Sequence, residues 1–169
     1  MDFLVVGAIL TTMIPYLFYA WAFKYTETLP KFLNQKRFIR ISQFFKLLDV
    51  AFSLPIMYRS GINSAGACIG LPMIFIGQYL NELVYTVLGD AGVYYGLEMK
   101  VVKPRWIGGF PFTIGDPQYK GSIMTVIGIY FCVQSTKDVL EITIAWIVSY
   151  FFIVCVENSP SSLQRKKTK

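Results

Sequence analysis

The sequence contains no histidine, and this absence removes whole classes of enzyme. Histidine is the commonest general base and the commonest metal ligand in proteins, so a Ser-His-Asp or Cys-His catalytic arrangement is excluded. The three cysteines, Cys68, Cys132 and Cys155, lie far apart within apolar runs and show neither metal-binding nor redox spacing. We therefore expect no zinc site and no metal cofactor of any kind.

Charge is also scarce. Charged residues make up 15% of the 169 residues, whereas hydrophobic residues make up 54% and aromatic residues 17%. The mean hydropathy is +0.50. A water-soluble domain of this size cannot bury so much apolar surface within itself. Lipid is the solvent that makes such a composition reasonable, and the sequence therefore predicts an integral membrane protein.

The few charges are mostly basic. Lys and Arg number 16 against 10 Asp and Glu, which gives a net charge of +6. No basic domain stands apart from the apolar segments, so we expect no nucleic-acid partner. In a membrane protein a basic excess is typical of loops that face the anionic cytoplasmic leaflet.

Long apolar runs divide the chain into membrane segments. Residues 3–23 and 65–88 are long enough to cross a bilayer, and residues 123–133 and 139–156 indicate two helices joined by a tight turn. Residues 47–58 form a shorter run that contains Asp49 and Pro55, which predicts a tilted or re-entrant segment. The fold class we expect is all-α: a polytopic membrane protein with four to five membrane helices in a single domain, residues 1–169.

Three basic pieces separate these runs. Residues 24–46 mix Lys and Arg with phenylalanines and resemble a basic amphipathic segment that lies on the membrane surface. The other two pieces are a polar connector at 89–122 and a C-terminal tail at 158–169. With five membrane segments all three lie on one side, and the positive-inside tendency places that side in the cytosol. The chain then divides into an N-terminal part (1–64), a core (65–157) and the basic tail.

The connector is rich in Gly, Pro and Tyr, and Glu157 directly follows the last apolar run. Glycine lets backbone approach a ligand closely, and tyrosine rings attract a positive centre. If the connector and Glu157 share one membrane face, they suit a positively charged cofactor. The alternative is a turn cluster that joins two spans, with tyrosines of the interfacial belt.

Two stretches carry a family resemblance. Phe110-Pro111-Phe112, followed by residues 116–122 (DPQYKGS), resembles the signature of the phospholipid N-methyltransferases, and so does Gly77-Gln78-Tyr79 leading to residues 88–96 (LGDAGVYYG). The resemblance covers residues 65–160. It implies transfer of methyl groups from S-adenosylmethionine (SAM) to a membrane phospholipid, converting phosphatidyl-N-methylethanolamine to the dimethyl lipid and then to phosphatidylcholine. It also implies an endoplasmic reticulum location, and the positive-inside placement of the connector then puts the active site on the cytosolic side. The rivals are an isoprenylcysteine carboxyl methyltransferase-like enzyme and a non-enzymatic membrane scaffold.

The resemblance also implies site residues. Catalytic candidates are Asp116, Tyr119 and Glu157; Tyr94, Tyr95 and Arg105 are candidates for binding the lipid. The cofactor set comprises Gly77, Gln78, Tyr79, Gly109, Phe110, Pro111, Pro117, Tyr119, Gly121, Glu157 and Asn158.

The chain departs from the family pattern at three places. Gly77-Gln78-Tyr79 lacks the second glycine of a Gly-x-Gly element, Glu157-Asn158 keeps only the first of two acids, and Asp116 stands where related enzymes have His. Structural alternatives accompany these candidates. The glycine and glutamine of the first element can simply pack helices, the aspartate can start a turn, and the glutamate can be an ordinary charge at a helix end. Arg105 can be a solvated loop charge, and Tyr94 and Tyr95 can be belt residues.

Overall fold

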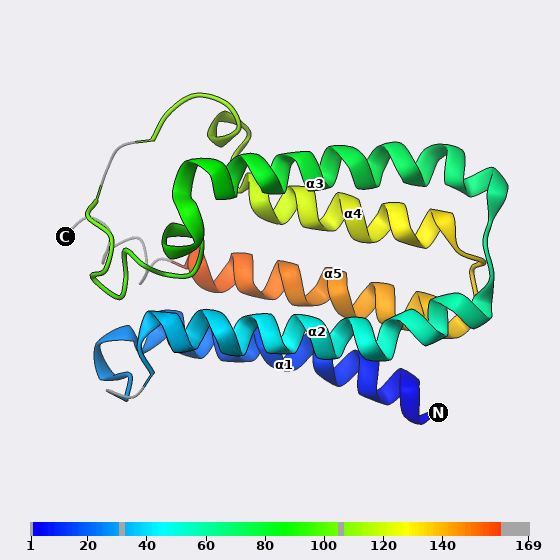
Figure 1. Cartoon of the computed structure of the whole chain (residues 1–169), viewed down its shortest axis with the longest axis horizontal. Coiled ribbons are helices and arrows are strands. Elements are labelled where there is room, and N and C mark those ends of the chain that lie inside the picture. Colours follow the sequence, from blue (N-terminus) through cyan, green and yellow to red (C-terminus); the bar gives the residue numbers. More distant parts are fainter. Residues whose placement is uncertain (1, 31–32, 105–106, 160–169) are drawn as a thin grey trace.

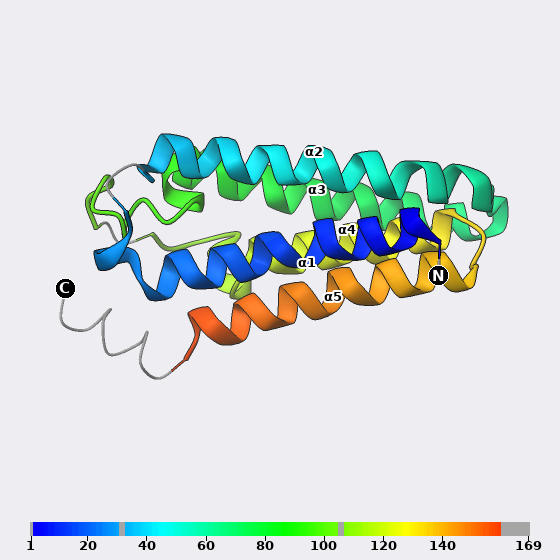
Figure 2. The ribbon, with the colours of Figure 1, turned by 90° about the horizontal axis from the view of Figure 1, so that it is seen from below.

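The computed structural model describes residues 2–30, 33–104 and 107–159, and within them five long helices run alternately in opposite directions along one bundle (Figures 1 and 2). They are α1 (Phe3–Lys24), α2 (Gln35–Ser60), α3 (Ser64–Val93), α4 (Pro117–Cys132) and α5 (Lys137–Glu157), with short 3₁₀ turns at η1 (Thr26–Thr28) and η2 (Phe112–Ile114). Helices α1, α3 and α5 are long and apolar enough to cross a membrane. The expected all-α membrane fold is confirmed.

Four of the five helices begin at a side-chain cap. The capping oxygens accept the backbone N–H groups that the first helical turn leaves unpaired, and they belong to Asp2, Asn34, Asn63 and Thr136. Helix α4 differs, because Asp116 occupies the capping position without such a bond and has a left-handed backbone (φ 44). Pro117 at the first position has no N–H to satisfy. The Asp116 carboxylate is thus left for other contacts.

Helix α2 differs from the sequence prediction. The basic segment 24–46 and the short apolar run 47–58 were expected to be separate, but residues 35–60 form one helix with Pro55 inside it. The reason is a continuous inner face: Phe38, Ser42, Asp49, Ser53 and Ile56 are all buried at helical spacing. Basic residues occupy the exposed positions of the first turns, which lowers the hydropathy without interrupting the buried face.

Glycines bring α3 and α4 into close contact. A Cβ atom on Gly121 would lie 2.6 Å from the carbonyl oxygen of Gly77, and one on Gly128 would lie 2.6 Å from that of Gly70. A Cβ atom on Gly66 would likewise lie too close to the carbonyl oxygen of Phe131, so these glycines permit the close approach of α3 and α4.

Helix α3 then bends at Gly89 (φ 67, ψ 167), so its last turn crosses the end of the bundle (Figure 1). This bend places Tyr94 and Tyr95 beside the other helices.

The helices form two groups joined by α5. Helix α3 pairs with α4, α1 packs against α2 and α5, and α4 contacts α5, whereas α2 and α3 make few direct contacts. The connectors after α1 and after α3 lie at one end of the bundle together with the C-terminal end of α5 (Figure 1). We call this the connector end.

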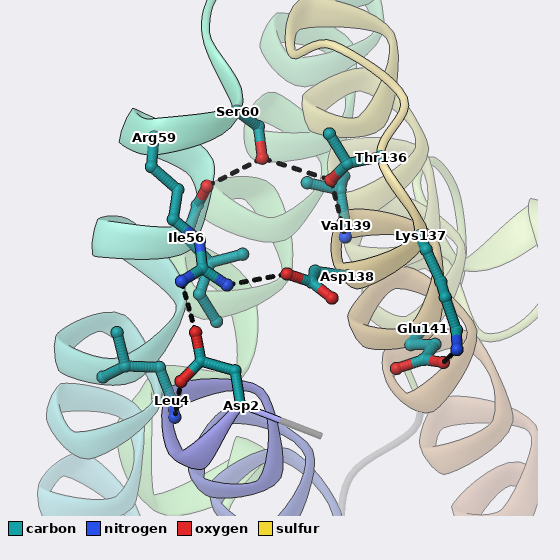
Figure 3. A network of polar contacts seen from close by, with 10 residues as sticks. All are labelled: Asp2, Leu4, Ile56, Arg59, Ser60, Thr136, Lys137, Asp138, Val139 and Glu141. Carbon is teal, nitrogen blue, oxygen red and sulfur yellow. Dashed lines mark hydrogen bonds and ion pairs between the residues drawn. The ribbon is translucent and has the colours of Figure 1, made fainter.

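At the opposite end, Arg59 on α2 pairs with Asp2 before α1 and with Asp138 on α5 (Figure 3). The Arg59 guanidinium lowers the pKa of Asp2 from its ordinary value of 3.8. Ser60 also contacts Thr136 there, at 3.2 Å between hydroxyl oxygens. These contacts link α1, α2 and α5 at the end away from the connector end.

Candidate functional site

Glu157, the last residue of α5, lies at the centre of the connector end. The hydroxyl groups of Tyr95 and Tyr119 both donate to its Oε1 atom, each over 2.7 Å. Tyr95 belongs to the connector after α3, and Tyr119 lies in the first turn of α4. One carboxylate oxygen thus joins three segments that are far apart in sequence, and Glu157 and the connector lie at the same end of the bundle.

Tyr95 is held as a neutral hydrogen-bond donor. Burial raises the pKa of Tyr95 well above its ordinary value of 10.0, and the neighbouring Tyr119 and Glu157 side chains raise it further. Its backbone is left-handed (φ 55), which is unfavourable for a bulky residue and marks a position fixed by its surroundings. Its ring also contacts Phe23 and Phe38.

A second polar link lies beside the first. The side-chain amide of Asn158 donates to Asp116 Oδ2 over 3.3 Å. Lys120 donates to the carbonyl oxygen of Ile114 and closes the turn before α4. The two acids predicted as catalytic candidates, Asp116 and Glu157, are therefore both tied to neighbouring segments at the connector end.

A pocket of about 280 Å³ surrounds these groups. It combines the carboxylates of Asp116 and Glu157 with aromatic and aliphatic side chains. Its lining residues are Phe23, Val84, Leu88, Gly92, Val93, Tyr95, Glu98, Phe112, Asp116, Pro117, Gln118, Tyr119 and Glu157. Acidic groups and aromatic faces fit a ligand that carries a positive centre and hydroxyl groups. We call this the acidic pocket.

A larger cavity of about 570 Å³ lies between the helices, deeper in the bundle. It has contributions from all five helices and the connector, and polar side chains such as Thr12, Gln78, Ser122 and Thr143 occur among its apolar lining. It shares Val93, Tyr95, Gln118 and Tyr119 with the acidic pocket. The tyrosines that bind Glu157 therefore form a wall common to both spaces. We call the larger space the bundle cavity.

Some of the site residues predicted from the sequence line the acidic pocket or the bundle cavity, and others line neither. Gln78 and Tyr94 line the bundle cavity, and Gln78 donates to Thr125 over 3.1 Å. Gly77 and Gly121 instead pack α3 against α4. Tyr79 is 54% exposed and lines neither space.

The remaining predicted positions lie in the connector. Gly109 has φ 85, Phe110 is 61% exposed and Pro111 is buried, and none of the three lines either space. Pro117 lines the acidic pocket. Arg105 lies outside the described residues.

Sequence reasoning missed several lining residues. Gln118 lies in the common wall, and Lys46 and Asp49 of α2 line the bundle cavity. An aspartate inside an otherwise apolar run was the one available signal for Asp49. Nothing local distinguishes Lys46 from the other basic residues of 24–46.

Comparison with known proteins gives two matches. Residues 66–161 match the family model described as phospholipid methyltransferase. The chain is 28% identical over 167 residues to the phosphatidyl-N-methylethanolamine N-methyltransferase of Arabidopsis thaliana, and the alignment covers 95% of this chain and 96% of that relative. No solved structure matches the chain.

Proposed function

The chain belongs to the phospholipid methyltransferase family, and we propose that it uses SAM to methylate the amine of phosphatidyl-N-methylethanolamine and then that of the dimethyl product, forming phosphatidylcholine. We place this activity in the endoplasmic reticulum membrane, with the connector end facing the cytosol. The observation that carries the proposal is the wall of Tyr95 and Tyr119 shared by the acidic pocket and the bundle cavity.

The acidic pocket suits SAM. When bound, SAM supplies an electrophilic methyl group on a positively charged sulfur. The Glu157 carboxylate accepts hydrogen bonds from the hydroxyl or ammonium groups of such a ligand, while Tyr95 and Tyr119 keep the carboxylate in place. Aromatic faces around the pocket favour the positive centre. No histidine or metal is needed for these contacts.

The bundle cavity suits the lipid head group. We propose that the lipid enters laterally from the bilayer between α2 and α3, which make few contacts. An amine in the cavity and a donor in the acidic pocket would meet at the common wall. There the nitrogen would bond to the methyl carbon as the methyl–sulfur bond breaks in line, and S-adenosylhomocysteine would leave from the acidic pocket. Catalysis of such a displacement rests on proximity and alignment.

The attacking amine must be neutral. It loses a proton before or during attack, and Asp116 and Glu157 are the candidate acceptors, directly or through water. Asp116 lines the acidic pocket, with its Oδ2 atom bound to Asn158. The tyrosine rings stabilise the positive charge that grows on nitrogen as the new bond forms.

A methylation assay with three head groups tests this function. Purified protein in nanodiscs receives methyl-labelled SAM and phosphatidylethanolamine, its monomethyl form or its dimethyl form. We expect labelled phosphatidylcholine from the monomethyl and dimethyl lipids. Label in none of the three would overturn the proposal, and label in a prenylcysteine ester instead would move the chain to the carboxyl-methylating branch.

A further inference from the structure

Two opposite charges lie one helical turn apart in the bundle cavity. Lys46 and Asp49 are the charged side chains among the residues that line it, all of which the structure describes. Lys46 Nζ donates to the hydroxyl of Tyr94 over 2.9 Å and lies 5.4 Å from the centre of that ring. Asp49 is 6% exposed, and its Oδ1 atom accepts from Thr12 over 2.6 Å and from Ser53 over 3.5 Å.

These charges do not neutralise each other. Among the described residues, the ion pairs within 4.0 Å join Arg59 to Asp2 and Asp138, and Lys137 to Glu141, so Lys46 and Asp49 remain apart. The partners of Asp49 are neutral hydroxyls, although an acid within a membrane helix is costly and usually marks a functional position. A cavity with separated charges of both signs is complementary to a zwitterion.

Asn81 supplies a further acceptor. It lines the same cavity, and its Oδ1 atom is buried with no hydrogen-bond donor among the described residues. Buried acceptors in proteins are nearly always paired, so this oxygen is expected to meet a donor from a ligand or water. An alkylammonium group is such a donor.

We propose that Lys46 binds the phosphate and Asp49 the protonated amine of the incoming phospholipid head group. The inference rests on the proposed function and names two substrate-binding residues for it. Lys46 lies nearer the connector end than Asp49 because α2 begins there.

On binding, the phosphate thus stays closer to the membrane surface while the protonated amine turns into the bundle. The amine leaves Asp49 and loses its proton when it moves to the common wall. Val50 and Leu54 line the cavity one and two turns beyond Lys46 on α2 and are 55% and 61% exposed, which leaves an apolar path for acyl chains.

The competing explanation is that Asp49 only ties α1 to α2 through Thr12. Asp49→Asn separates the two roles, because the amide oxygen still accepts the Thr12 hydroxyl while the charge is lost. Thr12→Val is the matched control, because it removes that hydrogen bond and keeps the charge. Lys46→Gln removes the positive charge alone.

The experiment measures lipid binding without turnover. Native mass spectrometry of the detergent-purified full chain compares phosphatidyl-N-methylethanolamine with phosphatidylglycerol of the same acyl chains. We expect the wild type and Thr12→Val to prefer the amine lipid. Asp49→Asn should lose at least tenfold in affinity for the amine lipid and lose the preference, whereas Lys46→Gln should bind both lipids more weakly.

An undiminished preference in Asp49→Asn, or undiminished binding of both lipids in Lys46→Gln, would overturn the inference. The methylation assay reports separately on the proposed function. A wild-type protein that methylates none of the head groups yet shows the charge-dependent lipid preference would refute the activity and leave this binding site standing.

Discussion

At the scale of single residues, the connector end depends on one carboxylate oxygen with two hydroxyl partners. Glu157 Oε1 accepts from Tyr95 and from Tyr119, and both donors are half-buried phenols. Hydrogen bonds to an ionised acceptor are stronger than neutral ones, so this arrangement fixes the carboxylate firmly. The three segments together therefore fix where the negative charge of Glu157 lies.

Glu157→Gln tests the cofactor role of that charge. The amide keeps the size of the side chain but removes the negative charge, and a hydrogen bond to a charged group contributes about 1.5–3 kcal/mol. We expect SAM affinity, measured by equilibrium dialysis without lipid, to fall by roughly ten- to a hundredfold. Glu141→Gln, on the same helix but paired with Lys137 at the opposite end, is the control. Equal affinity in the two variants would remove Glu157 from the cofactor site.

The two tyrosines provide a double-mutant cycle. In Tyr95→Phe or Tyr119→Phe the carboxylate keeps one hydroxyl partner, whereas the double variant leaves it with neither of them. We therefore expect the double change to weaken SAM binding by more than the sum of the single changes.

Tyr94→Phe combined with Tyr119→Phe serves as the comparison pair. The Tyr94 hydroxyl contacts Lys46 and Tyr85 rather than Glu157, so these two changes should add. Simple additivity in both cycles would mean that the tyrosines do not act on Glu157 as a unit.

At the scale of helices, the α3–α4 contact separates packing from ligand binding. Gly77 was a cofactor candidate on sequence grounds, yet its position against Gly121 and Thr125 gives it a packing role that needs no ligand. An added methyl group there meets backbone atoms of α4, which cannot move aside without shifting the helix. Whether Gly77 also touches the cofactor stays a prediction.

Gly77→Ala distinguishes these roles. Overpacking a tight helix contact costs about 1–3 kcal/mol, so the unfolding temperature of the detergent-solubilised protein should fall by several degrees. SAM affinity of the protein that remains folded should change little. Cys68→Ala on the exposed side of the same helix is the control and should change neither quantity. A large loss of SAM affinity at unchanged stability would restore the cofactor role.

Sequence predicted some elements and missed others for physical reasons. The spans that became α1, α3 and α5 were visible because continuous apolar runs reflect the surrounding lipid. Helix α2 was divided in two because its buried face includes polar residues such as Asp49, and hydropathy averages them with the basic exposed positions.

Sequence likewise predicted only part of the candidate site. Glu157 and Tyr119 stood out because a family motif and a span boundary marked them. Lys46 and Gln118 did not, because only tertiary packing decides which helix faces line a cavity.

At the scale of the whole molecule, the bundle has two chemically different ends. The connector end carries the acidic pocket and most of the Lys and Arg residues that the structure describes, whereas the other end has the exposed contacts of Arg59 and Lys137 with acids. Because successive helices run in opposite directions, α3 and α5 both end at the connector end, and α4 begins there. One helix more or fewer between α3 and α5 would place Tyr95 and Glu157 at opposite ends of the bundle.

Accessibility labelling tests how this bundle lies in the membrane. Cys68, Cys132 and Cys155 are first replaced by Ala, and single cysteines are introduced by Lys36→Cys, Lys100→Cys or Ser135→Cys at exposed positions. In sealed microsomes, with the cytosolic face outward, a membrane-impermeant maleimide should label the first two variants directly. The Ser135 variant should react only after detergent is added, because residue 135 lies between α4 and α5 at the opposite end. Methylation activity of each variant checks that it is folded. If Lys36→Cys and Lys100→Cys reacted from different sides, α2 and α3 would not both span the bilayer, and the lateral entry of lipid between them would have to be abandoned.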